Sequence, residues 1–580
     1  MSGLAQQHDD RAAERIAREP KAWEWMPIAA ALAYLGLTLH AARVETPTAD
    51  EFAHVPAGVA AWRQGRTDLY RVNPPLLKRL LAAPVAADAS VTAPIVVEPP
   101  MQWGPWEYGH RFQGANRAQY LTLMFRARWV AIGLGLLAGL VVFAWARDVF
   151  GLRAAAVVTS LFLLCPNVLA HGHLATIDMG ALTTILLAIF ALRWCHRDPT
   201  PARRLLAGAA LGLALATKFI AVLVLPAFAW LAILYRWRAT TRPPARRLLD
   251  AFADLAWIAA AALVVLNASL GFEDSFRAIG DFTFRSQFAL ALQSALPAWT
   301  PLPLPREWLL GFDAAKEISE HGEFGSYLMG QWSEHGWWYY NAVALAVKLP
   351  VAILALLAVS IPFWRRSDVP RIELYALLIP LGTLVVVFST ASNLNIGIRH
   401  VLPAFPFLFL LLGPVFMTTR SRRRERLSRA LAAAAAAATA VNVATIHPDY
   451  LTYFNAIAGG PAHGSEWLLD SNLDWGQDLY RVPAAVAAID PAEKPYLLYF
   501  GLVDPALYGL QYRLLPATPV EGIIAVSENF LWGYSYLTIA PGGGMVGVAG
   551  DTAAWLRERE PVRRLGSIRI YDTRPSGGAP

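Results

Sequence analysis

Apolar runs long enough to cross a membrane recur along the first 446 residues, and they constrain the fold more than any other feature. A helix needs about 17–25 predominantly apolar residues to cross the hydrocarbon core. The mean hydropathy of +0.38 and the hydrophobic content of 56% exclude an ordinary soluble protein. We expect about eleven spanning helices, of which the short fifth and sixth also suit a re-entrant hairpin: 26–42, 128–146, 154–170, 175–193, 204–217, 219–235, 253–270, 341–364, 372–390, 401–418 and 428–446.

Arginine placement indicates the orientation of these helices. With eleven crossings the arginine-rich span ends all fall on one side, and Arg and Lys favour the cytoplasmic side of short loops. The isoelectric point near 9.3 then reflects membrane orientation, and no nucleic-acid partner is expected. The Ala- and Arg-rich composition is typical of a high-GC bacterium, and we expect the protein in a bacterial inner (plasma) membrane. We expect a cytoplasmic N-terminal segment, a transmembrane region, two long external loops within it and a periplasmic C-terminal domain: 1–25, 26–446, 43–127 and 271–340, and 447–580.

The C-terminal part carries the pattern of a small α/β domain. Strand-like runs lie at 496–502, 523–526, 545–548 and 567–571, and a helix is expected through 482–488. About 130 residues are enough for a small domain with its own core. The fold class predicted from the sequence is therefore an α-helical polytopic membrane protein with a C-terminal extracytoplasmic α/β domain.

Adjacent carboxylates, Asp50 and Glu51, follow the first apolar run at its expected external end. Ionisable groups in membrane proteins are costly, so they mark functional sites by default. One carboxylate suits a general base that takes a proton from an acceptor hydroxyl or amine, while the other orients it. His54 follows within the same motif and is a candidate substrate contact. The alternative interpretation is a solvated pair at a helix end.

The next motif, Asn73-Pro-Pro-Leu-Leu-Lys78, combines a helix start with a cation. Proline favours the first turn of a helix, so Lys78 is expected one turn into it. A helix N-terminus with a lysine suits a phosphate group, and Asn73 is a candidate substrate contact. The alternative is an interfacial helix whose Lys78 extends toward lipid headgroups.

Further polar groups are expected near the external ends of later spans. Asp178 begins the fourth span, preceded by His171 and His173, and Lys218 lies between the two short spans. Asp178 is a candidate catalytic residue, the histidines are candidate substrate contacts, and Lys218 is a candidate partner for a lipid phosphate. The alternatives are helix capping by these groups, a metal held by the two histidines with Asp178, and a lysine that extends to the interface.

Three other segments complete the candidate residues. Arg399 suits a phosphate because its guanidinium forms paired hydrogen bonds, although interfacial anchoring also explains it. Glu334 and His335 lie in an aromatic-rich segment that suits either a sugar site or an interfacial belt. The segment Asp470-Ser-Asn-Leu-Asp-Trp475 mixes carboxylate, amide and indole groups, which suits carbohydrate and also helix capping.

These motifs together resemble the C-type (GT-C) membrane glycosyltransferases, in particular the protein O-mannosyltransferases and the bacterial aminoarabinose transferases. The resemblance covers roughly residues 25–420 and is carried by five motifs in their order along the chain: Asp50-Glu51, Asn73-Pro-Pro-Leu-Leu-Lys78, Ala175-Thr-Ile-Asp178, Ala216-Thr-Lys218 and Ile398-Arg399-His400-x-Leu-Pro403.

The resemblance implies transfer of a mannose- or pentose-like sugar from a polyprenyl phosphate, with inversion at C1, to a protein, lipid or glycan acceptor. It implies Asp50 as general base with Glu51 as its partner, Lys78 and Arg399 on the donor phosphate, and Asp178 lining the sugar or acceptor site. The expected partners are the lipid-linked sugar, membrane lipids and the acceptor. No cofactor or metal is expected, although a divalent cation is compatible. The alternatives are a lipid-linked oligosaccharide polymerase or ligase and a transporter or flippase of lipid-linked sugars.

Overall fold

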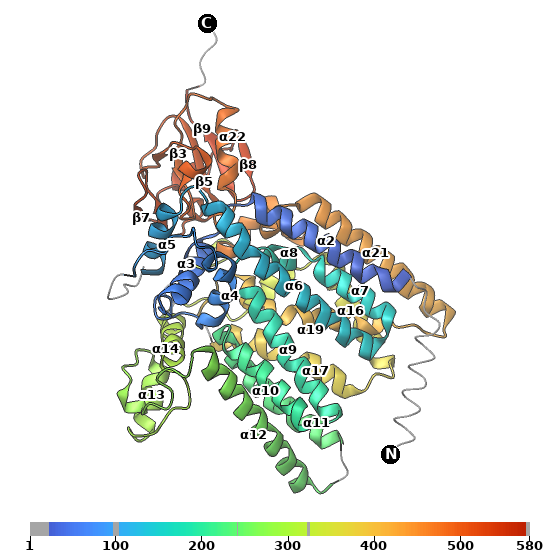
Figure 1. Ribbon diagram of the computed structural model, residues 1–580. Coiled ribbons are helices and arrows are strands. Elements are labelled where there is room, and N and C mark those ends of the chain that lie inside the picture. The colour runs from blue at the N-terminus through green and yellow to red at the C-terminus, as the bar shows by residue number, and fades with distance from the viewer. Residues whose placement is uncertain (1–21, 97–103, 240–241, 322–324, 392, 576–580) are drawn as a thin grey trace.

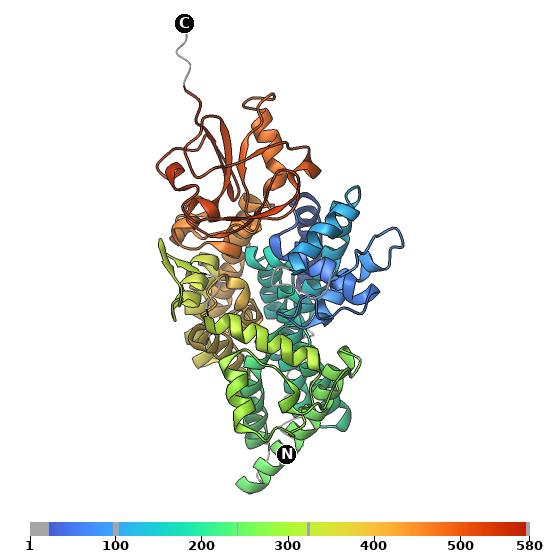
Figure 2. The same ribbon diagram turned by 90° about the vertical axis from the view of Figure 1, so that its left-hand side faces the viewer.

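The computed structural model describes residues 22–96, 104–239, 242–321, 325–391 and 393–575. Most of the predicted cytoplasmic segment 1–25 therefore lies outside the described residues. The described chain forms an elongated body of helices with a smaller β-containing domain at one end (Figures 1 and 2). This arrangement confirms the predicted fold class.

Seven helical segments of the described residues are long and apolar enough to cross a membrane, or nine when two bent pairs are counted as single spans. Each of the eleven predicted spans coincides with a helical segment. Two of these segments have fewer than 18 residues: α10 (Pro201–Leu215), which was expected to be short, and Leu402–Phe416, which contains α19 (Phe405–Leu410) and α20 (Gly413–Phe416). The seven long segments contain α2 (Ala22–Val44), α6 (Tyr120–Phe150), α9 (Asp178–Arg197), η1 (Phe219–Val224) with α11 (Leu225–Ala239), α12 (Pro244–Ser269), α17 (Arg371–Gly382) with η3 (Thr383–Val387) and α18 (Phe388–Ala391), and α21 (Arg422–Ile446).

Prolines account for the two bends. The helices α7 (Leu152–Leu163) and α8 (Pro166–Gly172) meet at 61°, and α15 (Tyr340–Lys348) and α16 (Val351–Arg366) meet at 109°. Pro166 begins α8, and Pro350 is the N-cap of α16. Proline lacks an N–H and disfavours helical backbone in the residue before it, so a helix ends there and a new one begins in another direction.

Short helices cover one end of the spanning bundle. They belong to the two long loops and pack beside the ends of α6, α9 and α12 (Figure 1). The first loop forms α3 (Ala49–Arg63), α4 (Pro75–Ala86) and α5 (Gly104–Ala115). The second forms η2 (Ile279–Asp281), α13 (Gln287–Ala295), α14 (Arg306–His321) and a hairpin of β1 (Ser326–Leu328) and β2 (Gln331–Ser333).

The C-terminal domain is built on a mixed five-stranded sheet in the order β4-β3-β5-β9-β8, with a separate β6-β7 pair. In the larger sheet β3 pairs in parallel with β4 and β5, while β5 and β8 pair antiparallel with β9. Four strands and α22 coincide with the predicted segments. The elements are β3 (Tyr496–Leu498), β4 (Arg513–Leu514), β5 (Ile523–Ser527), β6 (Tyr536–Ile539), β7 (Met545–Val548), β8 (Arg563–Leu565), β9 (Ile568–Asp572), α22 (Val482–Ala487) and α23 (Glu528–Leu531).

Several 3-10 turns complete the chain between these elements. Two precede α19 and the others lie in the C-terminal region: η4 (Ile398–His400), η5 (Leu402–Ala404), η6 (Tyr450–Thr452), η7 (Ala456–Ala458), η8 (Pro461–Glu466), η9 (Asp470–Asn472), η10 (Leu479–Arg481), η11 (Pro505–Tyr508) and η12 (Ala554–Leu556).

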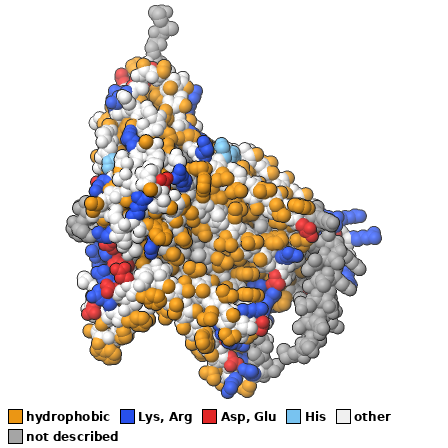
Figure 3. Space-filling view, viewed as in Figure 1, with side chains coloured by type: hydrophobic (Ala, Val, Ile, Leu, Met, Phe, Trp, Pro, Cys, Tyr) orange, Lys and Arg blue, Asp and Glu red, His pale blue; other side chains and the backbone are white. Residues whose placement is uncertain are grey.

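The surface agrees with a multi-pass membrane protein. Hydrophobic side chains cover most of the helical body on the face that Figure 3 shows. Lys and Arg lie at the end opposite the C-terminal domain and also along the left-hand side of the view. That end holds the first residues of α12 and α21, which begin with Pro-Ala-Arg-Arg and Arg-Arg-Arg-Glu-Arg. Trp129, Trp230 and Trp257 are among the large apolar side chains that remain exposed, as expected of a surface that contacts lipid.

Candidate active site

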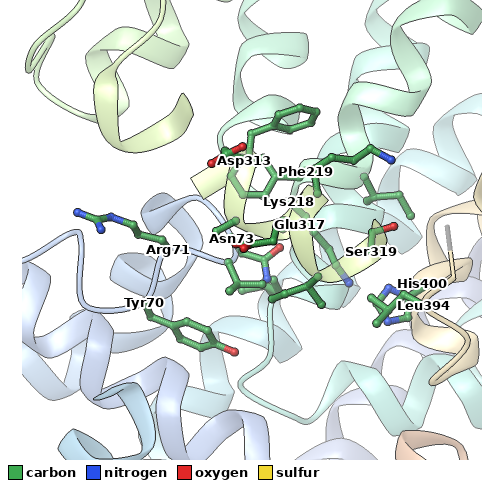
Figure 4. Close-up of a pocket in the computed structure, with 18 of the residues that line it drawn as sticks. Tyr70, Arg71, Asn73, Lys218, Phe219, Asp313, Glu317, Ser319, Leu394 and His400 are labelled. Carbon is green, nitrogen blue, oxygen red and sulfur yellow. The ribbon is translucent and has the colours of Figure 1, made fainter. Parts of the chain in front are cut away.

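A cavity of about 1380 Å³ lies where the helices of the two long loops, the span ends and the C-terminal domain meet. Figure 4 shows Tyr70 and Asn73 on one side of it and Leu394 and His400 on the other. The α14 helix contributes Asp313 and further side chains to the wall. The cavity therefore joins segments that are remote in sequence, which is typical of an active site.

Asp50 and Arg399 form an ion pair at this cavity. Arg399 Nη1 donates to Asp50 Oδ2 at 2.5 Å, and both residues line the cavity. The Arg399 guanidinium also lies over the Trp475 ring, 4.4 Å from its centroid. Burial acts to lower the pKa of Arg399, but Asp50 and two further carboxylates outweigh it and raise that pKa. The site thus holds a fixed cation beside a carboxylate that reaches solvent-accessible space.

A loop of the C-terminal region holds this pair in place. The Ala49 N–H donates to the Trp475 carbonyl at 3.0 Å, and the Thr46 N–H donates to the Gln477 carbonyl at 2.9 Å. On the other side, the Ile398 N–H donates to Asn472 Oδ1 at 2.9 Å. Segments 46–49 and 396–399 are therefore both fastened to residues 471–477, which brings Asp50 to Arg399.

Glu51 points away from this cavity although it adjoins Asp50. It is fully buried, and its two carboxylate oxygens accept hydrogen bonds from Arg128 at 2.7 Å each. The N–H groups of Thr48 and Ala175 donate to the same carboxylate at 2.8 and 2.7 Å. Burial acts to raise the pKa of Glu51, but Arg128 and these hydrogen bonds lower it. Glu51 therefore fixes the start of α3 against α6 and the segment before α9.

Lys218 and Asp178 form a second ion pair. Lys218 Nζ donates to Asp178 Oδ1 at 2.5 Å, and the Thr176 hydroxyl donates to the other oxygen at 2.9 Å. Asp178 is fully buried at the first residue of α9, whereas Lys218 is among the residues that line the cavity. The buried carboxylate of Asp178 therefore holds Lys218 in place at the cavity wall.

Lys78 is engaged by its own loop in this structure. Its ammonium donates to the backbone carbonyls of Tyr70 and Asn73, at 2.7 Å in the second case, and lies 4.6 Å from the Tyr70 ring centroid. Burial lowers the pKa of Lys78 to about 7. Tyr70 and Asn73 line the cavity, so Lys78 supports the cavity wall from within the loop. His54 stacks on Tyr70 at 5.2 Å, and burial lowers the pKa of its imidazole to about 4.

The remaining predicted contacts are dispersed. His173 is buried and bonds to Glu45 at 2.8 Å, while His171 lies with its ring centroid 6.3 Å from that of Trp475. Glu334 and His335 are exposed. Among the described residues no group of three or more His, Cys, Asp or Glu side chains is placed to hold a metal ion. The structure thus brings Asp50, Arg399, Asn73 and Lys218 together at one cavity.

The sequence indicates only the segment 470–475 of the C-terminal domain, and it does not indicate Phe500, Tyr534, Tyr536 or α14. Five residues of the C-terminal domain line the cavity: Asp470, Trp475, Phe500, Tyr534 and Tyr536. Several residues of α14 also line it, including Glu317 and Ser319. The polar and aromatic segment 470–475 was the available signal for the first group. Nothing in the local sequence around Tyr534 distinguishes it from a tyrosine of an ordinary sheet.

Residues 30–270 match the model of the dolichyl-phosphate-mannose-protein mannosyltransferase family. These residues contain the first four of the five motifs given above. The match confirms the resemblance to C-type membrane glycosyltransferases. None of the curated proteins compared with the chain matches it.

The chain is similar to several solved structures. ArnT from Cupriavidus metallidurans bound to undecaprenyl phosphate has 14% identity and a TM-score of 0.44, with 97% of this chain and 100% of that chain covered. The S. cerevisiae protein O-mannosyltransferase Pmt1-Pmt2 complex bound to the sugar donor has 11% identity and a TM-score of 0.48, covering 76% and 91%. The Archaeoglobus fulgidus oligosaccharyltransferase in its apo form has 12% identity and a TM-score of 0.44, covering 92% and 75%.

Proposed function

We propose that the protein transfers a sugar from a polyprenyl phosphate to an acceptor at the external face of a bacterial inner membrane. The observation that carries this proposal is the Asp50–Arg399 pair at the cavity. It combines a candidate base and a candidate phosphate ligand within hydrogen-bonding distance. The family match supports the same chemistry, since that family is named for sugar transfer from a lipid phosphate.

The cavity suits a lipid phosphate at one end. Phe219, Ile220 and Leu223 line it from η1, and Val387 and Phe388 line it from the segment of α17 and α18. Both segments belong to membrane spans, so an isoprenoid chain would lie against apolar side chains. Lys218 and Arg399 supply positive charge beside this apolar end. Lys78 is a further candidate for the phosphate if its loop moves to release the ammonium.

The proposed reaction is a direct displacement at C1 of the sugar. Asp50 accepts the proton of an acceptor hydroxyl or amine while the acceptor atom attacks C1. The bond between C1 and the phosphate oxygen breaks, and its electron pair leaves with the polyprenyl phosphate. Negative charge then grows on that phosphate, where Arg399 and Lys218 stabilise it electrostatically. Inversion at C1 follows from a single displacement.

The other predicted residues take supporting roles in this proposal. Glu51 positions Asp50 by anchoring the start of α3, and Asp178 positions Lys218. Asn73 contacts substrate at the cavity wall, and His54 supports Tyr70 beside it. The region 26–446 would form the transferase domain, and the domain 447–580 would lie outside and close the cavity.

Replacing Asp50 tests the proposal. Wild-type protein in nanodiscs would be given a panel of radiolabelled polyprenyl-phosphate sugars with membrane extract as acceptor. We expect transfer from one donor, reduced by at least about a hundredfold in Asp50→Asn with donor binding retained, because general-base catalysis contributes about that much or more. Asp88→Asn is the matched control, because Asp88 belongs to the same external loop and pairs with Arg126 away from the cavity.

Two results would contradict the proposal. The first is a transfer rate in Asp50→Asn close to that of Asp88→Asn. The second is tight donor binding without turnover of any donor, which would favour transport of lipid-linked sugars. A product that carries an oligosaccharide would instead identify a polymerase or ligase.

A further inference from the structure

The C-terminal domain presents an aromatic face to the cavity, formed by Trp475, Phe500, Tyr534 and Tyr536. The Phe500 ring centroid lies 5.3 Å from that of Tyr534 and 5.1 Å from that of Tyr536. Tyr534 and Tyr536 lie 6.0 Å apart. Four aromatic residues from three segments of one domain thus meet at the wall of a cavity whose other walls come from the membrane region.

Asp470 adds a carboxylate to this aromatic face. The Tyr534 hydroxyl donates to Asp470 Oδ2 at 2.7 Å, and the Asp470 N–H donates to Asn529 Oδ1 at 2.8 Å. The backbone of Asp470 has a φ of 58°, a left-handed conformation that few residues other than glycine adopt. Strain of this kind persists where surrounding structure holds it, and it concentrates at functional sites. The carboxylate itself lines the cavity.

The aromatic face joins the reaction centre directly. Trp475 supports the Arg399 guanidinium on its ring, and Arg399 bonds to Asp50. The apolar end of the cavity is formed by membrane spans, whereas the aromatic face belongs to the C-terminal domain. A group bound on this face would therefore lie near Asp50 and extend away from the lipid end.

The chemistry of this face matches a sugar ring. Flat aromatic side chains contact the C–H faces of a pyranose or furanose, and carboxylate, hydroxyl and guanidinium groups bond its hydroxyls. A mainly aromatic wall with a few convergent polar groups is also the usual make-up of a small-molecule site. A phosphate is not favoured at this face itself, because it carries a carboxylate and no cation apart from the bordering Arg399.

We propose that Asp470, Trp475, Phe500, Tyr534 and Tyr536 form a sugar-binding subsite supplied by the C-terminal domain. Its place in the reaction rests on the proposed function, but binding of a free sugar does not. The bound ring belongs either to the donor or to a glycan acceptor. The C-terminal domain is then part of the active site rather than an appended module.

Binding of simple glycosides tests the subsite independently of transfer. The full-length protein in nanodiscs would be examined by saturation-transfer NMR with a panel of methyl glycosides of hexoses and pentoses. We expect at least one glycoside to bind and Tyr536→Leu to weaken it by about tenfold, the loss expected for one aromatic contact. Tyr534→Phe keeps the ring and loses only the hydroxyl bonded to Asp470, so we expect a smaller loss.

Tyr496→Leu is the matched control. Tyr496 is also half-buried in the C-terminal domain and carries Arg513 on its ring at 4.1 Å, but it does not line the cavity. Thermal melting of each variant shows whether the domain remains folded. Equal glycoside binding by Tyr536→Leu and Tyr496→Leu overturns the proposal, and so does the lack of any binding by the wild-type protein.

The source of the sugar follows from kinetics once a donor is known. A raised KM for the donor in Tyr536→Leu assigns the subsite to the donor sugar, and a raised KM for the acceptor assigns it to a glycan acceptor. Glycoside binding without any transfer would keep the subsite and reject the proposed reaction. Sugar transfer by the wild type, together with glycoside binding that is unchanged in Tyr536→Leu, would support the proposed reaction and reject the subsite.

Discussion

Two neighbouring carboxylates take opposite environments in this chain. Asp50 reaches the cavity and bonds to Arg399, whereas Glu51 is fully buried on Arg128. Successive residues of a helix point about 100° apart, so adjacency in sequence does not place both at one site. The sequence indicates that the pair is functional, but the division of roles depends on α6 supplying Arg128 at a distance of 77 residues.

Replacing Glu51 should therefore affect stability first. Glu51→Gln leaves Arg128 buried without its anionic partner, and breaking a buried pair in this way costs about 3–5 kcal/mol. We expect a clear drop in melting temperature in nanodiscs. Asp50→Asn should melt much closer to the wild type, because its partner Arg399 borders the open cavity. Equal melting of the two variants would show that the Glu51 pair does not anchor α3.

The loop beside Trp475 holds two buried acids that share one hydroxyl. The Ser567 hydroxyl lies 3.1 Å from Asp474 Oδ1 and 3.0 Å from Asp478 Oδ2. Burial raises the pKa of Asp474 to about 8 and that of Asp478 to about 7. Both acids are therefore favoured in the protonated form in the folded domain. In the unfolded chain they titrate near pH 4.

Stability of the C-terminal domain should consequently fall as the pH rises from about 4 to about 8. Over that range the folded state retains protons that the unfolded state has lost, so raising the pH favours unfolding. Asp474→Asn stays neutral and should flatten the fall in melting temperature between pH 5 and 8. Asp551→Asn, at an exposed site of the same domain, should keep the wild-type slope. An unchanged slope in Asp474→Asn would contradict the raised pKa of Asp474 in the folded domain.

At the scale of elements, the packing of α3 on α4 sets the position of the cavity wall. Gly58 lies where the two helices are in close contact, since a Cβ built there would lie 2.1 Å from the Lys78 carbonyl oxygen and 2.6 Å from the Ala82 Cβ. The crossing thus requires glycine on α3. It also holds the α3–α4 loop that carries Tyr70 and Asn73 to the cavity.

Gly58→Ala should separate these helices. A backbone oxygen cannot yield to a methyl group, so α4 must shift, and we expect a loss of about 1–3 kcal/mol from overpacking together with a reduced transfer rate. Gly114→Ala is the control, because Gly114 is exposed in α5 and has no atom within 4 Å of the added Cβ. Wild-type melting and activity in Gly58→Ala would show that the crossing is not tightly packed.

Local patterns in the sequence predict the spanning segments and four strands of the C-terminal domain. They do not predict β4, β6 and β8, and they do not predict the cavity. Apolar run length locates every spanning segment, and alternation locates β3, β5, β7 and β9. The two bends follow from Pro166 and Pro350. The predicted spans 154–170 and 341–364 contain these prolines but were expected to be single helices. Asp50 and Arg399 meet across 349 positions, and Trp475 joins them from a third segment, so no local pattern encodes their contact.

For the whole molecule, the decisive property is which side of the membrane the cavity faces. The cavity lies at the end that carries the C-terminal domain, and the arginine-rich starts of α12 and α21 lie at the other end (Figures 1 and 3). Arginines near span ends favour the cytoplasm. A base and phosphate site at the opposite end would then act on substrates at the external face of that membrane.

Two matched Ser→Cys variants test this orientation. Ser535 is exposed in the C-terminal domain and Ser421 is exposed just before α21, while the native Cys165 and Cys195 are both buried. In intact spheroplasts, a membrane-impermeant maleimide should label Ser535→Cys and leave Ser421→Cys unlabelled until the membrane is permeabilised. The native protein sets the background of the assay. Labelling of Ser421→Cys alone in intact cells would place the cavity in the cytoplasm, where the Asp50–Arg399 pair would meet a different set of acceptors.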